Sequence, residues 1–198
     1  LQLGVQTDTG DAMGQPIRTA AVPTLDDAHI TKLLTSFHGS FLQTPPTYSA
    51  VKVRGRPAYW WARQHRPVQL APRRTHIFEL TLLDWTPQHT LPPDGALQAG
   101  PSGGEVGAGL SSPQGGTITF RTHCSSGTYI RSLAELIAER LGTVGHVTQL
   151  TRVRVGRWGI EEAKSFAWIR EASAEQVTAA LLPVSPTTGV QHPSPVQT

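Results

Sequence analysis

The residues best suited to chemistry follow a run of small side chains at positions 124–128 of the 198-residue chain. Tyr129, Ile130 and Arg131 come next, at the predicted start of a helix. The free N–H groups of a helix start can bind an anion, whereas the helix dipole disfavours a cation in the first turn. Arg131 therefore has either a carboxylate or phosphate partner or the ordinary role of a surface arginine. Tyr129 is either a core residue or a ring for base stacking.

A second candidate is the polar turn at residues 7–11, which contains two carboxylates. Asp8 and Asp11 are of the residue type that commonly forms turns, and that role alone would explain them. The alternative is an ion-pair network with an arginine, which would fix the protonation states of its members. Spacing along the chain leaves both interpretations open.

Other kinds of chemistry find little support in the sequence. The single cysteine, Cys124, excludes an intramolecular disulfide and a multi-cysteine zinc site, and it favours a reducing compartment such as the cytoplasm. The eight histidines show no metal-ligand spacing, and neither a P-loop nor a dinucleotide-binding glycine motif occurs. No apolar run reaches the about 18 residues of a membrane span. We therefore expect no metal, no cofactor and no membrane.

Basic residues are concentrated in one part of the chain. The formal net charge is only +3, yet residues 28–78 contain eight lysines and arginines and no acidic residue. Three aromatic residues at positions 59–61 lie among them. Cations neutralise phosphates and flat rings stack on bases, so this segment favours nucleic acid over an ordinary solvated surface. A second and weaker basic group begins at Arg152.

These residues must be positioned by helices and strands. The order of the predicted strands and helices along the chain indicates an α+β fold with a mixed, mainly antiparallel sheet and flanking helices. A Gly- and Pro-rich loop at residues 86–116 separates two strands that we expect to pair as a hairpin. The predicted strands cover residues 1–6, 75–85, 117–124 and 147–155. The predicted helices cover residues 25–38, 57–64, 128–141, 160–171 and 174–182, with Thr24 as the N-cap of the first helix and Pro57 at the first position of the second.

Four runs of residues resemble motifs of the bacterial TruB family of tRNA pseudouridine synthases, and they occur in the family's order. They are distributed over residues 1–163, and the 86–116 segment is the one long stretch without a counterpart, as an insertion would be. The four runs are Leu3-Gly4-Val5-Gln6-Thr7-Asp8-Thr9-Gly10-Asp11-Ala12-Met13-Gly14; Gln43-Thr44-Pro45-Pro46-Thr47-Tyr48-Ser49-Ala50-Val51-Lys52; Cys124 through Arg131; and Gly145-His146-Val147 with Leu150, Arg152 and Val155-Gly156.

This resemblance implies an isomerase that needs no cofactor. Enzymes of the family detach a uracil from its ribose, rotate it and rejoin it through carbon, usually at uridine 55 in the T-loop of tRNA. Since that base is stacked in the loop, it must be flipped into a pocket. By resemblance, Arg131 pairs with the catalytic aspartate and Asp11 is a second carboxylate in the same network. Tyr129 and Leu150 look like walls of the pocket. The residues that we expect to face RNA are Tyr48, Ser49, Lys52, Arg54, Arg63 and Arg152.

One departure from the family pattern matters most. The family's catalytic aspartate lies in a Gly-x-Leu-Asp-Pro-x-Ala-Thr-Gly-like motif, which the 198 residues do not contain. Thr24-Leu25-Asp26 only echoes that motif and fits a helix start better. The chain begins with Leu rather than Met. We therefore expect a fragment that is inactive alone, in which residues 1–182 form part of a catalytic domain and residues 183–198 lead to an absent C-terminal RNA-binding domain.

Two other interpretations stay open. The first is a non-catalytic module of the same fold that binds or folds tRNA, which the basic segment would serve equally well. The second is a relative that works within a guide-RNA particle, although the pattern at residues 45–52 favours the stand-alone bacterial type. A monomer is the expected oligomeric state.

Overall fold

The computed structural model describes residues 1–66, 68–88 and 115–181. The chain divides into two compact units, Leu1–Leu150 and Thr151–Thr198. The elements of the first unit are β1 Gln2–Leu3, β2 Val5–Thr7, β3 Pro16–Thr19, α1 Asp27–Thr35, β4 Gly39–Gln43, β5 Lys52–Val53, β6 Arg56–Pro57, α2 Ala58–Arg63, β7 Arg73–Gln88, β8 Gly115–Cys124, α3 Ile130–Arg140 and β9 Gly145–His146. Those of the second unit are β10 Arg154–Val155, β11 Trp158–Gly159, the 3₁₀ helix η1 Ile160–Glu162, α4 Phe166–Glu171 and α5 Ala174–Ala180.

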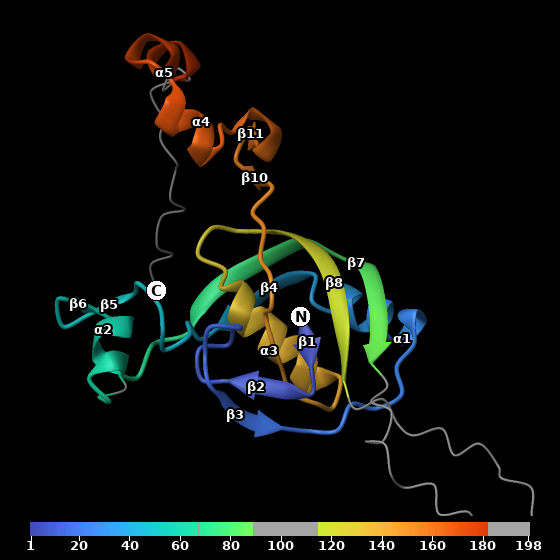
Figure 1. Ribbon diagram of the computed structural model, residues 1–198. Coiled ribbons are helices and arrows are strands. Elements are labelled where there is room, and N and C mark those ends of the chain that lie inside the picture. Colours follow the sequence, from blue (N-terminus) through green and yellow to red (C-terminus); the bar gives the residue numbers. More distant parts are fainter. Residues whose placement is uncertain (67, 89–114, 182–198) are drawn as a thin grey trace, which may run out of the picture. The chain divides into compact units, whose positions relative to one another are not determined.

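A five-stranded antiparallel sheet lies at the centre of the first unit, in the order β4-β7-β8-β1-β9. Its longest pair is β7 with β8, which runs from Ile77 opposite Cys124 to Gln88 opposite Gly115. Figure 1 shows this hairpin curving around α3. Two short ribbons, β2–β3 and β5–β6, extend from the sheet's connections. The predicted hairpin and the α+β class with a mainly antiparallel sheet are confirmed.

The core of the first unit is formed by α1, α3 and the sheet. Apolar residues recur every three or four positions along each helix, so that they share one face. Ile30 and Leu34 of α1, like Leu133 and Ile137 of α3, have no exposed surface. They belong to one apolar cluster with the hairpin residues Ile77, Leu80 and Ile118. This cluster fixes α3, and with it the residues at the start of that helix.

Helix α1 begins later and ends earlier than the sequence pattern predicts. Its N-cap is Asp26 and not Thr24, because the Asp26 carboxylate accepts a hydrogen bond from the His29 N–H at 2.7 Å. The helix ends at Thr35 instead of residue 38. Tighter turns follow, in which the Phe37 N–H donates to the Leu34 carbonyl at 3.1 Å. The helix itself was therefore predicted correctly, and its two ends were not.

The predicted strand at residues 147–155 is wrong. Val147 donates its N–H to the Gly10 carbonyl at 3.0 Å and accepts from the Ala12 N–H at 2.9 Å. Its main chain therefore binds the turn after β2 and is not available for a ladder of its own. Within residues 147–155, regular strand pairing is confined to β10 with β11, whereas β9, which pairs with β1, ends at His146.

Several other boundaries differ by a few residues. Residues 86–88 and 115–116 of the predicted loop pair within the hairpin, and its remaining residues, like the 183–198 segment, lie outside the described part of the chain. The predicted helix at 160–171 is divided into η1 and α4, α5 ends at Ala180, and Pro57 is the N-cap of α2. Among the described helices, none has both the length and the apolar content that crossing a bilayer requires.

Candidate active site

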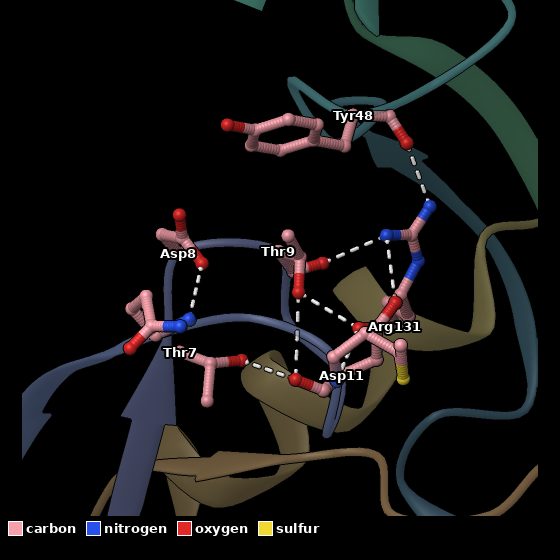
Figure 2. A network of polar contacts seen from close by, with 8 residues as sticks. Thr7, Asp8, Thr9, Asp11, Tyr48 and Arg131 are labelled. Atoms are coloured by element: carbon pink, nitrogen blue, oxygen red, sulfur yellow. Dashed lines mark hydrogen bonds and ion pairs between the residues drawn. The ribbon is translucent and has the colours of Figure 1, made fainter. Parts of the chain in front are cut away.

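The turn that joins β2 to β3 is shaped by its own side chains (Figure 2). Thr7 donates its hydroxyl to the main-chain oxygen of Asp11 at 2.7 Å. Asp8 closes the base of the turn, because its N–H donates to the Gln15 carbonyl at 3.0 Å and its carboxylate accepts from the Gln15 N–H at 2.8 Å. Gly10 has a φ of 72°, a left-handed conformation that glycine adopts at little cost. The turn therefore holds Asp11 in one position.

The Asp11 carboxylate accepts hydrogen bonds from three donors. Its Oδ1 atom accepts from the Thr9 hydroxyl at 2.8 Å and from the Met13 N–H at 3.0 Å. Its Oδ2 atom accepts from Nη1 of Arg131, also at 3.0 Å, in an ion pair between residues that lie 120 positions apart. A single parallel bridge to Val147 anchors the main chain beneath. Asp11 is thus both a turn residue and the carboxylate partner of an arginine.

Arg131 lies in the first turn of α3 and is held from three sides. Besides Asp11, its Nη1 donates to the Thr9 carbonyl at 2.8 Å and its Nη2 donates to the Tyr48 carbonyl at 2.7 Å. The side chain is 24% exposed. A guanidinium has five N–H donors in a fixed plane, and these contacts occupy three of them. The carboxylate and two carbonyls fix the plane, and the two remaining donors have no hydrogen-bond partner among the described residues.

Of the segment expected to face RNA, Tyr48 and Ser49 lie nearest to this pair. Tyr48 is half-buried and contributes its carbonyl to Arg131, while Figure 2 shows its ring pointing away from the guanidinium. Ser49 is only 4% exposed, and its Oγ has neither solvent contact nor a hydrogen-bond partner within the described structure. The Ser49 hydroxyl is therefore not available to a ligand in this conformation.

Three basic residues that we expect to face RNA are exposed on the β5–β6 ribbon and on α2. Lys52, Arg54 and Arg63 all point into solvent. The Trp61 indole N–H donates to the Val53 carbonyl at 3.0 Å and ties α2 to the ribbon. The Arg63 guanidinium lies 5.5 Å from the ring centre of Tyr59, so one face of that ring is occupied by a cation and not by a base.

The other predicted site residues differ in their exposure and in the unit to which they belong. Tyr129 is half-buried at the N-cap of α3, two residues before Arg131. Leu150 is 60% exposed at the end of the first unit. Arg152 is exposed and belongs to the second unit, which is described by itself. The structure thus brings Asp11, Arg131 and the Tyr48 carbonyl together.

Gln43 at the end of β4 is a residue near the site that the sequence analysis did not select. Its side-chain amide makes two hydrogen bonds with the main chain of Tyr129. It stands in one of the four runs that carry the resemblance, but residue type gave no reason to single it out. A glutamine at the end of an exposed edge strand would ordinarily face solvent, and only its burial distinguishes it.

Glu135 is a second charged residue of α3, one helical turn after Arg131. It lines an open groove together with Gln6, Arg18 and Glu139. Burial raises the pKa of the Glu135 carboxyl, while a hydrogen bond from the Gln6 amide at 3.5 Å and the charge of Arg131 oppose that increase. The ionised form is therefore less favourable in the folded protein than in the unfolded chain.

We expect Glu135→Gln to stabilise the protein more at pH 7 than at pH 4. A carboxyl whose pKa is raised by folding contributes stability at low pH, and that contribution is lost as the pH rises through the folded-state pKa. The gain at neutral pH should be less than about 1 kcal/mol, since the side chain is partly exposed. Thermal unfolding midpoints at both pH values would measure it, with Glu139→Gln, at an exposed glutamate one turn later in the same helix, as control. A gain that does not increase with pH would contradict this assignment.

The arrangement suits recognition of an anion or of a second carboxylate. Within the described residues, no group of three or more His, Cys, Asp or Glu side chains is gathered as a metal site would require. The available chemistry is instead a fixed guanidinium that is paired with Asp11 and donates to two main-chain carbonyls.

Comparisons with known proteins agree on one family. Residues 1–99 match the model described as "TruB family pseudouridylate synthase (N terminal domain)". The "tRNA pseudouridine synthase B" of Novosphingobium aromaticivorans is 42% identical over 163 residues, which are 82% of this chain and 45% of that protein. The protein of the same name from Hydrogenovibrio crunogenus is 38% identical over 156 residues, which are 79% of this chain and 42% of that protein.

This chain therefore spans a little less than half the length of these curated relatives. Among solved structures, a "Crystal Structure of a Cbf5-Nop10-Gar1 Complex" aligns with a TM-score of 0.49 and 20% identity, over 83% of this chain and 39% of that chain.

Proposed function

The chain belongs to the TruB family of pseudouridylate synthases, and from this premise we propose that the protein isomerises uridine 55 in the T-loop of tRNA to pseudouridine. In this reaction the N1–C1′ bond of the nucleotide breaks and a C5–C1′ bond forms. The hydrogen of C5 leaves as a proton and N1 takes one up, so that substrate and product contain the same atoms. No redox partner or cofactor is needed.

One observation carries the proposal, the fixation of Arg131 at the start of α3. The half-buried guanidinium donates three hydrogen bonds to residues far from it in sequence, and its two other donors have no partner within the described part of the chain. An ordinary surface arginine needs no such support. A guanidinium positioned in this way keeps a neighbouring carboxylate ionised, which is the role that the family resemblance gives to Arg131.

The nucleophilic aspartate itself is proposed to lie in a segment upstream of Leu1. The Asp11 carboxylate accepts from Thr9, Met13 and Arg131, so it is engaged by its own turn and by the arginine. We assign to Asp11 the task of orienting the guanidinium and to Arg131 the task of binding the upstream carboxylate. Tyr129 and Leu150 are proposed as walls of the pocket for the flipped base.

The proposed RNA surface is the exposed basic face of β5–β6 and α2, with Lys52, Arg54 and Arg63 as phosphate contacts. Tyr48 and Arg152 are added by resemblance. Ser49 is included only through its main chain, because its side chain is buried. We infer further that the protein acts as a cytoplasmic monomer, with residues 1–182 as part of its catalytic domain and without a metal ion.

An assay on unmodified tRNA tests this proposal. The 198-residue chain and a version extended upstream of Leu1 would be incubated with a tRNA transcript that carries tritium at C5 of its uridines. We expect the extended protein to release tritium as water, and a transcript with cytidine at position 55 to release none. The chain alone is expected to bind tRNA without releasing tritium.

Two outcomes would contradict parts of the proposal. Equal turnover by both proteins would show that the nucleophile is not upstream of Leu1. Tight tRNA binding by the extended protein without any tritium release would favour the alternative, a module that binds or folds tRNA. The basic face of β5–β6 and α2 supports that alternative equally well. A module that only binds or folds tRNA would, however, have no need of a fixed Arg131.

A further inference from the structure

Helix α3 begins without the usual side-chain cap. Its N-cap residue is Tyr129, whose side chain makes no capping hydrogen bond. Serine, threonine, aspartate or asparagine at this position would satisfy one of the free N–H groups of the first turn. The start of α3, which carries Arg131, is therefore held by something other than its own cap.

That support comes from Gln43, the last residue of edge strand β4. Its Oε1 accepts a hydrogen bond from the Tyr129 N–H at 2.8 Å, and its Nε2 donates to the Tyr129 carbonyl at 3.0 Å. The same carbonyl also accepts from the Leu133 N–H at 3.0 Å, the first hydrogen bond of the helix. One side-chain amide thus binds both polar groups of a single main-chain residue.

The amide of Gln43 has little access to water, because the residue is only 6% exposed. A buried amide that loses its partners is costly, so the two bonds restrict where Tyr129 can lie. Since Tyr129 is two residues before Arg131, a displacement of its main chain would be passed directly to the base of the arginine side chain.

The chain that follows Gln43 reaches the arginine a second time. Five residues later, the Tyr48 carbonyl accepts from Nη2 of Arg131 at 2.7 Å. Pro45 is buried and Pro46 half-buried between these two contacts, and their fixed φ angles stiffen the connection. The segment from Gln43 to Tyr48 therefore binds both the main chain before Arg131 and the guanidinium itself.

We propose that Gln43 is a positioning residue for Arg131, which acts by fixing the main chain of Tyr129 at the start of α3. This inference rests on the proposed function, because the consequence of misplacing Arg131 is measured as a rate of pseudouridine formation. The Gln43 side chain forms its hydrogen bonds with Tyr129 and not with the guanidinium, so its proposed effect on Arg131 passes through the main chain of Tyr129.

Two substitutions separate this role from a merely structural one. Gln43→Leu keeps the approximate volume and removes both hydrogen bonds. Gln43→Glu keeps both when its carboxyl is protonated, since the C=O accepts from the Tyr129 N–H and the O–H donates to the Tyr129 carbonyl. When it is ionised, the donor is lost and a negative charge faces a carbonyl oxygen. Burial raises the pKa of such a carboxyl and brings its titration toward the working pH.

The measured quantity is the single-turnover rate at saturating tRNA, in the protein extended upstream of Leu1. We expect Gln43→Leu to lower this rate about 10- to 100-fold at every pH, with the tRNA dissociation constant changed less than about threefold. For Gln43→Glu, the ratio of its rate to that of the wild type should increase as the pH is lowered from about 8 to about 5.5. Using a ratio cancels titrations that both proteins share.

Gln88→Leu and Gln88→Glu are matched controls. Gln88 is an exposed glutamine at the end of β7, and its Oε1 accepts a hydrogen bond from the Gln2 side chain at 3.1 Å. Neither control should change the rate or its pH dependence. Circular dichroism of each variant reports folding, and comparison of Gln43→Glu with itself across pH keeps the test valid if Gln43→Leu folds poorly.

The positioning role is overturned by a rate ratio for Gln43→Glu that does not change with pH, or by losses confined to tRNA affinity. A failure of the proposed function is seen separately, because it would leave the wild-type protein without tritium release. Release by the wild type together with normal rates in both Gln43 variants would reject the positioning role alone.

Discussion

Arg131→Ala, in the protein extended upstream of Leu1, is expected to lower the single-turnover rate of pseudouridine formation about a thousandfold. The tRNA dissociation constant should change by less than about threefold, because the proposed phosphate contacts lie on β5–β6 and α2. The substitution removes the donors of three hydrogen bonds, to Asp11, Thr9 and Tyr48. It also removes the two other donors, which we assign to the proposed upstream carboxylate. Rapid-mixing assays and filter binding would measure the rate and the affinity.

Arg131→Lys should recover little of this loss. An ammonium is a single point with three donors, and it cannot reach two carbonyls and a carboxylate that are arranged around a planar fork. Arg63→Ala provides the opposite pattern, since it removes a proposed phosphate contact and should raise the dissociation constant and reduce its salt dependence. A normal rate for Arg131→Ala, or a loss that appears only in affinity, would refute the role assigned to Arg131.

The parts of the fold that sequence patterns predicted well are those in which local and long-range preferences agree. The apolar stripe of Leu133 and Ile137 defines α3, and the alternation around Ile118 defines β8. Both patterns are satisfied by the same apolar cluster. Where two neighbouring residues compete for one position, as Thr24 and Asp26 do for the N-cap of α1, local preference alone chose wrongly.

The error at residues 147–155 has a different cause. Val147 has the residue type and the alternation of a strand, but its main-chain groups bind Gly10 and Ala12 in a turn that lies more than 130 positions earlier. A pattern within the segment cannot contain that information. Here the requirement to hold the Asp11 turn overrides the local β propensity.

The candidate site shows the same division. Residue type and spacing could not decide between an isolated surface arginine and an arginine paired with Asp11, because the ion pair joins residues 120 positions apart. Resemblance to a family predicted that these two residues share a network. In the structure, Nη1 of Arg131 lies 3.0 Å from Oδ2 of Asp11. Gln43 escaped both approaches, since neither its type nor its neighbours indicates that it is buried against Tyr129.

The run Gly145-His146-Val147 is explained by the same turn. His146 places Nδ1 2.8 Å from the Val5 carbonyl, so this nitrogen carries the proton and β9 is tied to the strand before the turn. Val147 binds both Gly10 and Ala12. Gly145 allows β9 to approach β1 closely, because a Cβ atom at this position would lie 2.7 Å from the main-chain oxygen of Gln2.

Gly145→Ala is therefore expected to lower the free energy of unfolding by about 1–3 kcal/mol, the usual cost of overfilling a packed region. The added methyl group would also lie 3.1 Å from Cβ of Ala138 in α3. A shift of β9 away from β1 would therefore be opposed by the contact with α3. Because β9 leads directly into Val147, the displacement should loosen the Asp11 turn and lower the isomerisation rate as well. Gly115→Ala in β8 is the matched control, since among the described residues its Cβ would meet nothing closer than 3.4 Å and an alanine suits a strand better than glycine. Thermal unfolding of both variants would measure the difference, and equal midpoints would show that the approach of β9 to β1 does not require a glycine.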